Sequence, residues 1–217
     1  MIVEMGGHAE RQIMEASRAL HDRDVDRAAQ VIEADKAIDH LHEQVDDEIM
    51  RLIALRQPKA QDLRRVIGAL KVSANLERVG DYAKNMAKRT SVISESPQVG
   101  SVTVTLKRIA GLVQSMLADV LDAYVSHNVE LANDVRIRDE EVDHMHNSLF
   151  REILTHMMES PVSITPCMHL LFISKNLERI GDHITGISEQ VHFMLIGEYP
   201  SEERSKVDTT SKASAES

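Results

Sequence analysis

Residues Asn75–Asp81, NLERVGD, return as NLERIGD at Asn176–Asp182, 101 positions further along the chain. Six of the seven letters are identical, and the seventh exchanges valine for isoleucine. Each copy holds an acid at positions i and i+4, Glu77 with Asp81 and Glu178 with Asp182. In an α-helix these positions share one face, so each copy places two carboxylates side by side. Because like charges at that spacing destabilise a helix, the repeated pair indicates a bound cation or basic partners that neutralise it.

The composition around this repeat predicts an all-α protein. The 217 residues are 42% hydrophobic and only 3% aromatic, with no Trp, 9 Gly and 5 Pro, so turns are few and helices long. A net charge of −10 argues against a general nucleic-acid binder, which needs a basic face. The single Cys167 excludes an internal disulfide and a Cys-based zinc finger. No signal peptide or run of about 20 apolar residues is recognised, so a cytoplasmic protein is expected.

Apolar spacing and turn residues divide the chain into two copies of one plan. Helices are predicted over residues 3–22, 24–56, 59–90, 102–126 and 128–158, and from the Pro161–Pro166 segment to residue 196. A second alignment, Asp35–His42 with Asp139–His146 at an offset of 104, extends the repeat beyond the opening motif. The expected domains are a first repeat at 1–93, a linker at 94–101, a second repeat at 102–198 and a disordered tail at 199–217. The fold class is therefore all-α, with two tandem three-helix units.

Four acidic pairs occupy matching places in the two repeats. In the third and sixth helices the acids continue one apolar stripe, so they are expected in line with buried positions, where an uncompensated charge is very costly. If the second and third helices of each repeat pack antiparallel, their acidic pairs face each other. The resulting boxes of four carboxylates are Asp35, Asp39, Glu77 and Asp81 in the first repeat, and Asp139, Asp143, Glu178 and Asp182 in the second. All-oxygen boxes suit Mg, Mn and Fe, Zn also accepts carboxylates, and His42, His146 and His183 are secondary ligand candidates.

Two other interpretations stay open on the residues alone. Arg78 and Arg179, inside the motifs, could neutralise the acids in a metal-free helical scaffold. The Glu-x-x-His spacings at Glu141–His144 and Glu189–His192 are those of ferritin-like carboxylate-bridged metalloenzymes, but the first repeat lacks them. The mid-helix glycines Gly80 and Gly181 each cost about 1 kcal/mol relative to Ala, which favours a close helix crossing at the motif.

At this point the sequence resembles the PhoU family of phosphate-uptake regulators. The resemblance covers Met5 to about Glu198 and rests on Met5–Gly7, Ala60–Leu63, Gln57-Pro58, Ile32–Asp35 with Ile38-Asp39, and the two acidic motifs. It implies two three-helix bundles related by a pseudo-twofold axis, with multinuclear metal clusters on the acidic motifs of some members. It also implies a non-enzymatic negative regulator of phosphate signalling, often dimeric. Such a regulator would connect a phosphate-specific ABC transporter at the inner membrane with a phosphate-sensing histidine kinase.

Two departures from the family pattern affect these expectations. The first helix of the family begins well upstream of the Met-Gly-Gly segment, whereas here Met1 lies four residues before Met5. Lys175 stands where the first repeat has Ala74, and it directs a cation towards the second acidic box. The first box is accordingly expected to be the better metal site.

Overall fold

The computed structural model describes residues 1–96 and 99–200. Within this part the chain forms six long helices, one 3-10 turn and no strand, which confirms the all-α fold class. The elements are α1 (Ile2–Asp22), α2 (Val25–Arg56), α3 (Gln61–Ile93), α4 (Gly100–Ser126), α5 (Val129–Glu159), η1 (Pro161–Ser163) and α6 (Ile164–Ile196). The predicted helix ends agree to within a few residues, and α6 begins at Ile164, between Pro161 and Pro166 as predicted, directly after η1. The predicted disordered tail lies almost entirely outside the described residues.

The two repeats begin with the same hairpin, built from the same local signals. Asp24 Oδ1 accepts a hydrogen bond from the backbone N–H of Arg27 at 2.8 Å, and Asn128 Oδ1 accepts one from that of Leu131 at 3.1 Å. These N-caps start α2 and α5. The preceding residue is left-handed in both hairpins, with φ of 58° at Arg23 and 57° at His127, and it ends α1 and α4. The duplication in sequence is therefore a duplication in backbone geometry.

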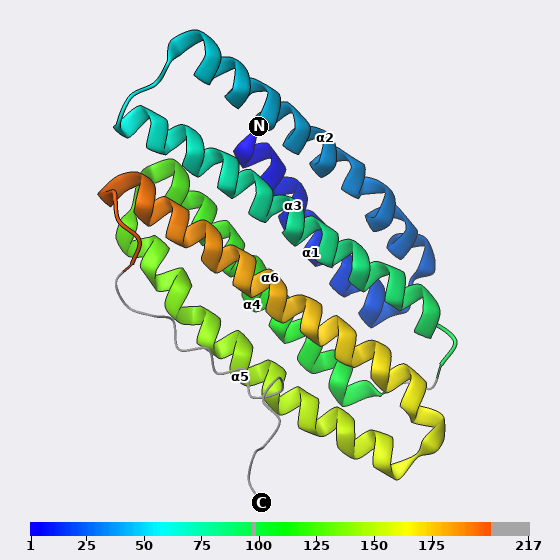
Figure 1. Cartoon of the computed structure of the whole chain (residues 1–217). Coiled ribbons are helices and arrows are strands. Elements are labelled where there is room, and N and C mark those ends of the chain that lie inside the picture. The colour runs from blue at the N-terminus through cyan, green and yellow to red at the C-terminus, as the bar shows by residue number, and fades with distance from the viewer. Residues whose placement is uncertain (97–98, 201–217) are drawn as a thin grey trace, which may run out of the picture.

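Figure 1 shows four helices side by side in the order α2, α3, α6, α5, with α1 and α4 behind them. Each repeat packs its three helices against one another, and the repeats join through α3 against α6 and α1 against α4. The contact between α3 and α6 is the most extensive of all, so the two NLER motifs lie on the helices at the centre of the molecule. The outer helices α2 and α5 contact only their own repeats.

One continuous apolar core runs through both repeats. Its largest fully buried side chains come from all six helices and include Met5, Ile13, Ile38, Leu76, Met86, Leu106, Ile109, Met116, Leu117, Leu149, Ile153 and Ile173. At roughly 1.5 to 3 kcal/mol for each large apolar side chain removed from water, this core holds the long helices together. Helix α4 is long and apolar enough to cross a membrane by length and composition. Its buried residues, from Val102 to Ala123, pack against α1, α5 and α6, which is the pattern of a core helix.

The face of α3 that carries the acids is less buried than the sequence predicts. Leu63 and Ala74 are exposed, and Val66, Ile67 and Leu70 are only half-buried. The fully buried face of α3 is the opposite one, which includes Val72, Leu76 and Val79. Apolar residues on two sides of α3 therefore mark one core face and one partly covered flank, and the acids lie on the flank.

Candidate functional site

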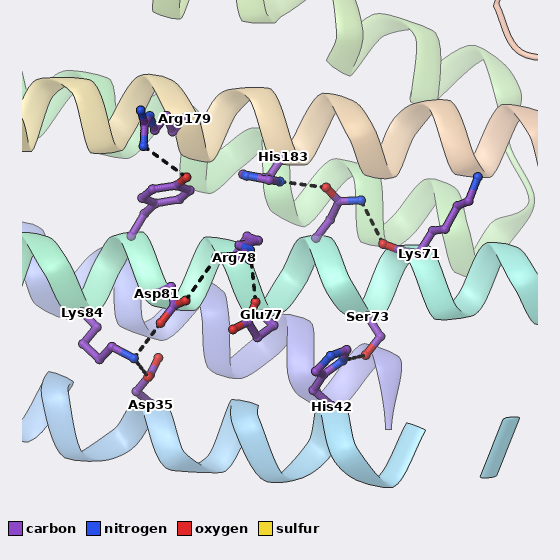
Figure 2. Close-up of polar contacts among 12 residues, drawn as sticks. Asp35, His42, Lys71, Ser73, Glu77, Arg78, Asp81, Lys84, Arg179 and His183 are labelled. Carbon is purple, nitrogen blue, oxygen red and sulfur yellow. Dashed lines mark hydrogen bonds and ion pairs between the residues drawn. The ribbon is translucent and has the colours of Figure 1, made fainter. Parts of the chain in front are cut away.

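A lysine lies at the centre of the first acidic cluster. Lys84, one turn after the motif on α3, has its Nζ 2.6 Å from Asp81 Oδ1 and in direct contact with Asp35 Oδ2 from α2 (Figure 2). Burial lowers the pKa of Lys84, but the hydrogen bonds to Asp35 and Asp81 outweigh it and raise the pKa well above its ordinary value. Lys84 therefore stays charged and joins the two helices as an ion pair.

The other oxygen of Asp35 is also occupied. Gln12 on α1 donates from Nε2 to Asp35 Oδ1 at 3.3 Å and to the backbone carbonyl of Val31 at 3.4 Å. Asp35 is only 3% exposed, so both carboxylate oxygens depend on these internal donors. All three helices of the first repeat thus meet at this carboxylate.

The remaining acids of the first box lie at the rim of the same cluster. Burial and the charge of Asp35 raise the pKa of Asp39, although its side chain is exposed on α2. Partial burial and the neighbouring Asp81 likewise raise the pKa of Glu77. Asp39 is also close enough to Asp81 for that charge to raise its pKa, and Lys84 joins Asp35 to Asp81, so acids of α2 and α3 approach each other at this point. The acid that acts on Glu77 lies on its own helix, and the box of four carboxylates stays a prediction. The structure adds Lys84, which the sequence interpretation did not include.

The arginine inside the first motif contributes little to this cluster. The Arg78 side chain is 59% exposed, and its nitrogens lie 3.6 Å from Glu77 and 3.9 Å from Asp81. Such exposed pairs contribute about 0 to 1 kcal/mol. The main neutralising cation of the first cluster is therefore Lys84 rather than Arg78.

The second acidic cluster is more deeply buried. Asp139 and Asp143 on α5 and Glu178 on α6 are all less than 5% exposed, while Asp182 is half-buried. Lys175 Nζ approaches Glu178 Oε1 at 2.9 Å from a partly exposed position. Within the described residues Glu178 Oε2 is buried and has no hydrogen-bond partner. Burial chiefly raises the pKa of Glu178, with help from Asp182 and Asp143 and opposition from Lys175.

A histidine and a serine flank each cluster in the same arrangement. His42 Nδ1 lies 2.8 Å from Ser73 Oγ, and His146 Nδ1 lies 2.7 Å from Ser174 Oγ. The charge of His42 also acts on the pKa of Glu77, which places that imidazole beside the first cluster. A hydrogen bond at one ring nitrogen orients an imidazole and fixes its tautomer, as it does for metal-bound histidines. Both histidines thus stay secondary candidates for nitrogen ligands.

The two motif glycines make room for an aspartate on the facing helix. A Cβ on Gly80 would lie 2.9 Å from Ile38 Cδ1 and 3.2 Å from Asp35 Oδ1, and one on Gly181 would collide with Asp139 Oδ1. The predicted close helix crossing is confirmed at both positions. Each glycine admits the first aspartate of its box between the helices.

His183 and Arg179 belong to the seam between the repeats rather than to the acidic clusters. His183 Nδ1 lies 2.8 Å from Asn75 Oδ1, and its ring stacks on Tyr82 with centroids 5.6 Å apart. Arg179 reaches Tyr82 as well, with its guanidinium 5.6 Å from the ring centre (Figure 2). The predictions of His183 as a metal ligand and of Arg179 as a counter-ion are therefore not supported by where these side chains lie.

Among residues 1–96 and 99–200, no three His, Cys, Asp or Glu side chains are arranged ready to hold a metal ion. Whether a metal ion fits either acidic cluster therefore depends on which side chains could bind it after a small movement of those side chains. In the first cluster Lys84 and Gln12 occupy both oxygens of Asp35, so the residues present do not fit a metal. In the second cluster the buried, unpartnered Glu178 Oε2 beside Asp143 and Asp182 fits an oxygen-binding cation.

Sequence reasoning missed Lys84 and Gln12 for different reasons. Lys84 is three positions after Asp81, a spacing at which helical side chains meet, so its contact with Asp81 was accessible to sequence analysis. Gln12 sits on α1, in no motif, and only the packing of α1 against α2 brings it to Asp35.

The arrangement of helices and clusters can now be compared with known proteins. The PhoU domain family matches residues 2–90 and 106–191, once in each repeat. The chain belongs to the PhoU family. It is 46% identical to the "Phosphate-specific transport system accessory protein PhoU homolog" of Caulobacter vibrioides, over 97% of this chain and 92% of that protein. It is also 46% identical to the homologue of the same name from Rhizobium meliloti, over 97% and 89% of the two chains.

Solved structures of the PhoU family share this fold. The crystal structure of PhoU from Pseudomonas aeruginosa superposes with a TM-score of 0.86 at 36% identity, covering 91% of this chain and 94% of that one. The phosphate transport system regulatory protein PhoU from Streptococcus pneumoniae gives 0.84 at 28% identity, covering 93% and 94%. Two tandem PhoU-like bundles are thus the fold of this chain, and its relatives are named as accessory and regulatory proteins of phosphate transport.

Proposed function

We propose that this protein is a negative regulator of phosphate uptake and phosphate-responsive signalling, working in the cytoplasm without an enzymatic step. In this role it links a phosphate-specific ABC transporter to a phosphate-sensing histidine kinase, with peripheral association at the membrane complexes. The observation that carries the proposal is the 46% identity, over almost the whole chain, to proteins named for the phosphate-specific transport system. The homodimer implied by the family resemblance is part of the same proposal.

The fold offers surfaces suited to an adaptor. Among the described residues, helices α2 and α5 contact only their own repeats, and no other described element covers the outer side of either helix (Figure 1). Both carry exposed apolar side chains near the ends of their hairpins, including Met50 and Leu55 on α2 and Met158 on α5. Two edges of similar architecture could engage two different partners at once.

Affinity capture tests the regulatory role. A tagged copy of the full chain is expressed in cells lacking the native gene, grown with ample phosphate or starved of it. Mass spectrometry of the cross-linked, captured material should identify the transporter ATPase, the histidine kinase, or both, in a phosphate-dependent ratio. Deletion of the gene should raise phosphate-starvation gene expression in ample phosphate. Capture of neither partner in either condition, with no effect of the deletion, would reject the proposal.

The proposal extends to metal binding through the second acidic cluster. A divalent or trivalent ion such as Fe, Zn, Mn or Mg would supply positive charge to carboxylates that otherwise repel one another. In the second cluster Asp139 and Asp143 would hold it from α5, and Glu178 and Asp182 from α6. These residues would thereby fasten the outer helix of the second repeat to its central helix.

Elemental analysis of protein purified without chelator tests this part. Glu178→Gln keeps the shape of the side chain but removes a charged ligand, so metal content should fall. Glu141→Gln, on the exposed side of the same helix pair, is the matched control and should leave the content unchanged. Equal metal content in wild type, Glu178→Gln and Asp182→Asn would reject the assignment.

A metal-free helical scaffold is the second candidate, and Lys84 is the observation that favours it. An ion pair between Lys84, Asp35 and Asp81 already neutralises part of the first cluster. Thermal melting with EDTA, and with added Mn or Zn, separates the two candidates. The scaffold predicts no shift in the melting temperature, whereas a metal that binds only the folded state raises it.

The ferritin-like alternative has less support from the structure. His144 is exposed on the outside of α5, and His192 Nδ1 lies 2.8 Å from the backbone carbonyl of Glu198 near the end of α6. Neither histidine belongs to a group of three ligand-type side chains within the described residues. A ferroxidase assay on wild type and His144→Ala would show activity lost in the variant if this alternative were correct.

A further inference from the structure

The two residues that donate to Asp35 in the first acidic cluster are not repeated at the corresponding positions of the second repeat. By the motif offset of 101 residues, Lys84 corresponds to Thr185, whose hydroxyl donates to the Gly181 carbonyl of its own helix at 3.0 Å. By the hairpin offset of 104, Gln12 corresponds to Met116, which is fully buried and apolar. The acids of the two boxes match letter for letter, but the side chains that serve Asp35 do not.

Lys84 is less exposed than Lys175, the lysine at the second cluster, and it bridges two helices. Lys84 contacts two carboxylates from two helices, and its side chain is 20% exposed. Lys175 contacts Glu178 from the preceding turn of the same helix, and its side chain is 34% exposed. A more exposed lysine side chain moves into solvent at lower cost, whereas removing Lys84 leaves the buried carboxylate of Asp35 without its ion pair.

A metal ion and Lys84 would compete for the same oxygens. Two cations that share one carboxylate site repel each other, and the repulsion is stronger in a partly buried site than in water. A metal entering the first cluster must therefore expel Lys84 from both Asp35 and Asp81. In the second cluster the buried Glu178 Oε2 has no hydrogen-bond partner among the described residues, so no such bond to it has to be broken.

We propose that Lys84 is the resident cation of the first acidic cluster and that the protein carries metal through the second cluster alone. The two repeats then differ in role: the first is closed by an internal ion pair, and the second is the one that responds to metal. This inference rests on the metal-binding part of the proposed function, and it reverses the order expected from Lys175 alone.

Titration with Mn²⁺ tests this division, because electron paramagnetic resonance reports the free ion directly. The full chain is stripped with EDTA, exchanged into chelator-free buffer and titrated as wild type, Lys84→Thr and the double variant Lys84→Thr with Asp35→Asn. Threonine copies the residue of the second repeat. Lys88→Thr, which removes an exposed lysine one turn further along α3, controls for the loss of charge.

The expected result is that Lys84→Thr binds roughly twice as much Mn²⁺ as wild type at saturation, because one filled cluster becomes two. The added Asp35→Asn change should return binding to the wild-type level, and Lys88→Thr should not raise it. Circular dichroism shows whether each variant is folded, and Lys84→Ser provides a second variant if Lys84→Thr is not.

Two outcomes would overturn the proposal. If Lys84→Thr and Lys84→Ser bind no more Mn²⁺ than wild type at saturation, Lys84 does not exclude metal from the first cluster. Binding by wild type that falls in Asp35→Asn as much as in Glu178→Gln would show that the first cluster already holds metal. A separate comparison tests the proposed second site. If Glu178→Gln binds as much Mn²⁺ as wild type, the second cluster is not the metal site.

Discussion

The two acidic clusters carry the same four acid types at matching positions but neutralise them in different ways. In the first, a lysine from α3 and a glutamine from α1 occupy both oxygens of Asp35. In the second, three of the four acids are almost fully buried, and Glu178 meets a lysine from its own helix. The comparison shows that a motif fixes where carboxylates lie, whereas residues outside it decide what cation they meet.

Two structural features beside the acids are present in both repeats. Both repeats keep a glycine that admits an aspartate between the helices, and both keep a histidine within hydrogen-bond distance of a serine. These features position the acids and the imidazole in both repeats alike. The clusters differ in the side chains that contact the acids and in how deeply the acids are buried, and the following changes probe these two properties.

The largest effect should come from Lys84→Ala in EDTA. The change leaves Asp35 buried beside Asp39 and Asp81 without its cation, and breaking a buried ion pair from one side costs several kcal/mol. Because Lys84 is partly exposed, we expect the free energy of unfolding to fall by about 2 to 4 kcal/mol in urea titrations.

Lys88→Ala is the matched control, since Lys88 is exposed one turn further along α3. It should change the free energy of unfolding by less than about 0.5 kcal/mol. Lys175→Ala sharpens the comparison, because Lys175 is more exposed than Lys84 and its removal should therefore cost less stability. A loss in Lys175→Ala as large as in Lys84→Ala would contradict the difference between the clusters.

The next largest effect should come from Gly181→Ala. The added methyl group would overlap the carboxylate of Asp139, and overpacking of this kind typically costs about 1 to 3 kcal/mol. Alanine also gains about 1 kcal/mol over glycine from helix propensity, which the collision must exceed. Thermal and urea unfolding should therefore show a net loss of stability.

Gly111→Ala supplies the control for Gly181→Ala. Gly111 lies inside α4, and a Cβ there would have no atom within 4 Å, so only the propensity gain remains. This variant should be more stable than wild type by about 0.5 to 1 kcal/mol. If Gly181→Ala were stabilised to the same degree, the close approach of Asp139 to α6 would be wrong.

Much of the fold could be predicted because its signals are local and repeated. The NLER motif, the acidic segment before each His-x-His and the caps at Asp24 and Asn128 recur at offsets of 101 and 104 residues. Long apolar periodicities then predict six helices whose ends agree with the structure to within a few residues. The burial of the apolar stripe of α3 that ends at Glu77 was harder to predict. Periodicity alone does not distinguish a core face from a partly covered flank.

The composition of the candidate site was only partly predictable. The facing of α2 against α3 follows from a short connection between antiparallel helices, and it brings the predicted acids together. Gln12 reaches Asp35 only because α1 packs behind them, a tertiary contact that carries no signal in the sequence. His183 has an acid beside it in sequence, yet it turns to Tyr82 across the seam between the repeats.

A smaller effect is expected from Gln12→Met, which copies the residue of the second repeat. The variant loses the hydrogen bonds to Asp35 and Val31 but gains apolar contact, so the free energy of unfolding should fall by only about 1 kcal/mol. Gln30→Met, at an exposed position on α2, is the control. No loss in Gln12→Met relative to Gln30→Met would mean that Asp35 does not depend on this donor.

The smallest effect is the pH dependence of stability in EDTA. The pKa of Glu178 is raised in the folded protein, chiefly by burial, so its contribution is fully present below the pKa of the unfolded chain. It is lost as the pH rises through the folded pKa, because the folded state then releases the proton that it binds more tightly. The contribution of Glu178 to wild-type stability should therefore fall as the pH rises from the acid range, by at most about 1.4 kcal/mol per pH unit.

Glu178→Gln removes the titrating group and should flatten this slope in urea titrations between acid and neutral pH. Glu77→Gln should flatten it less, because the pKa of Glu77 is raised in the same direction but its side chain is 24% exposed against 5% for Glu178. The difference between the two variants measures how much more deeply the second cluster buries its acids. If Glu77→Gln flattened the slope of stability against pH more than Glu178→Gln, the more strongly perturbed carboxylate would lie in the first cluster. The deeper burial of the acids in the second cluster would then be contradicted.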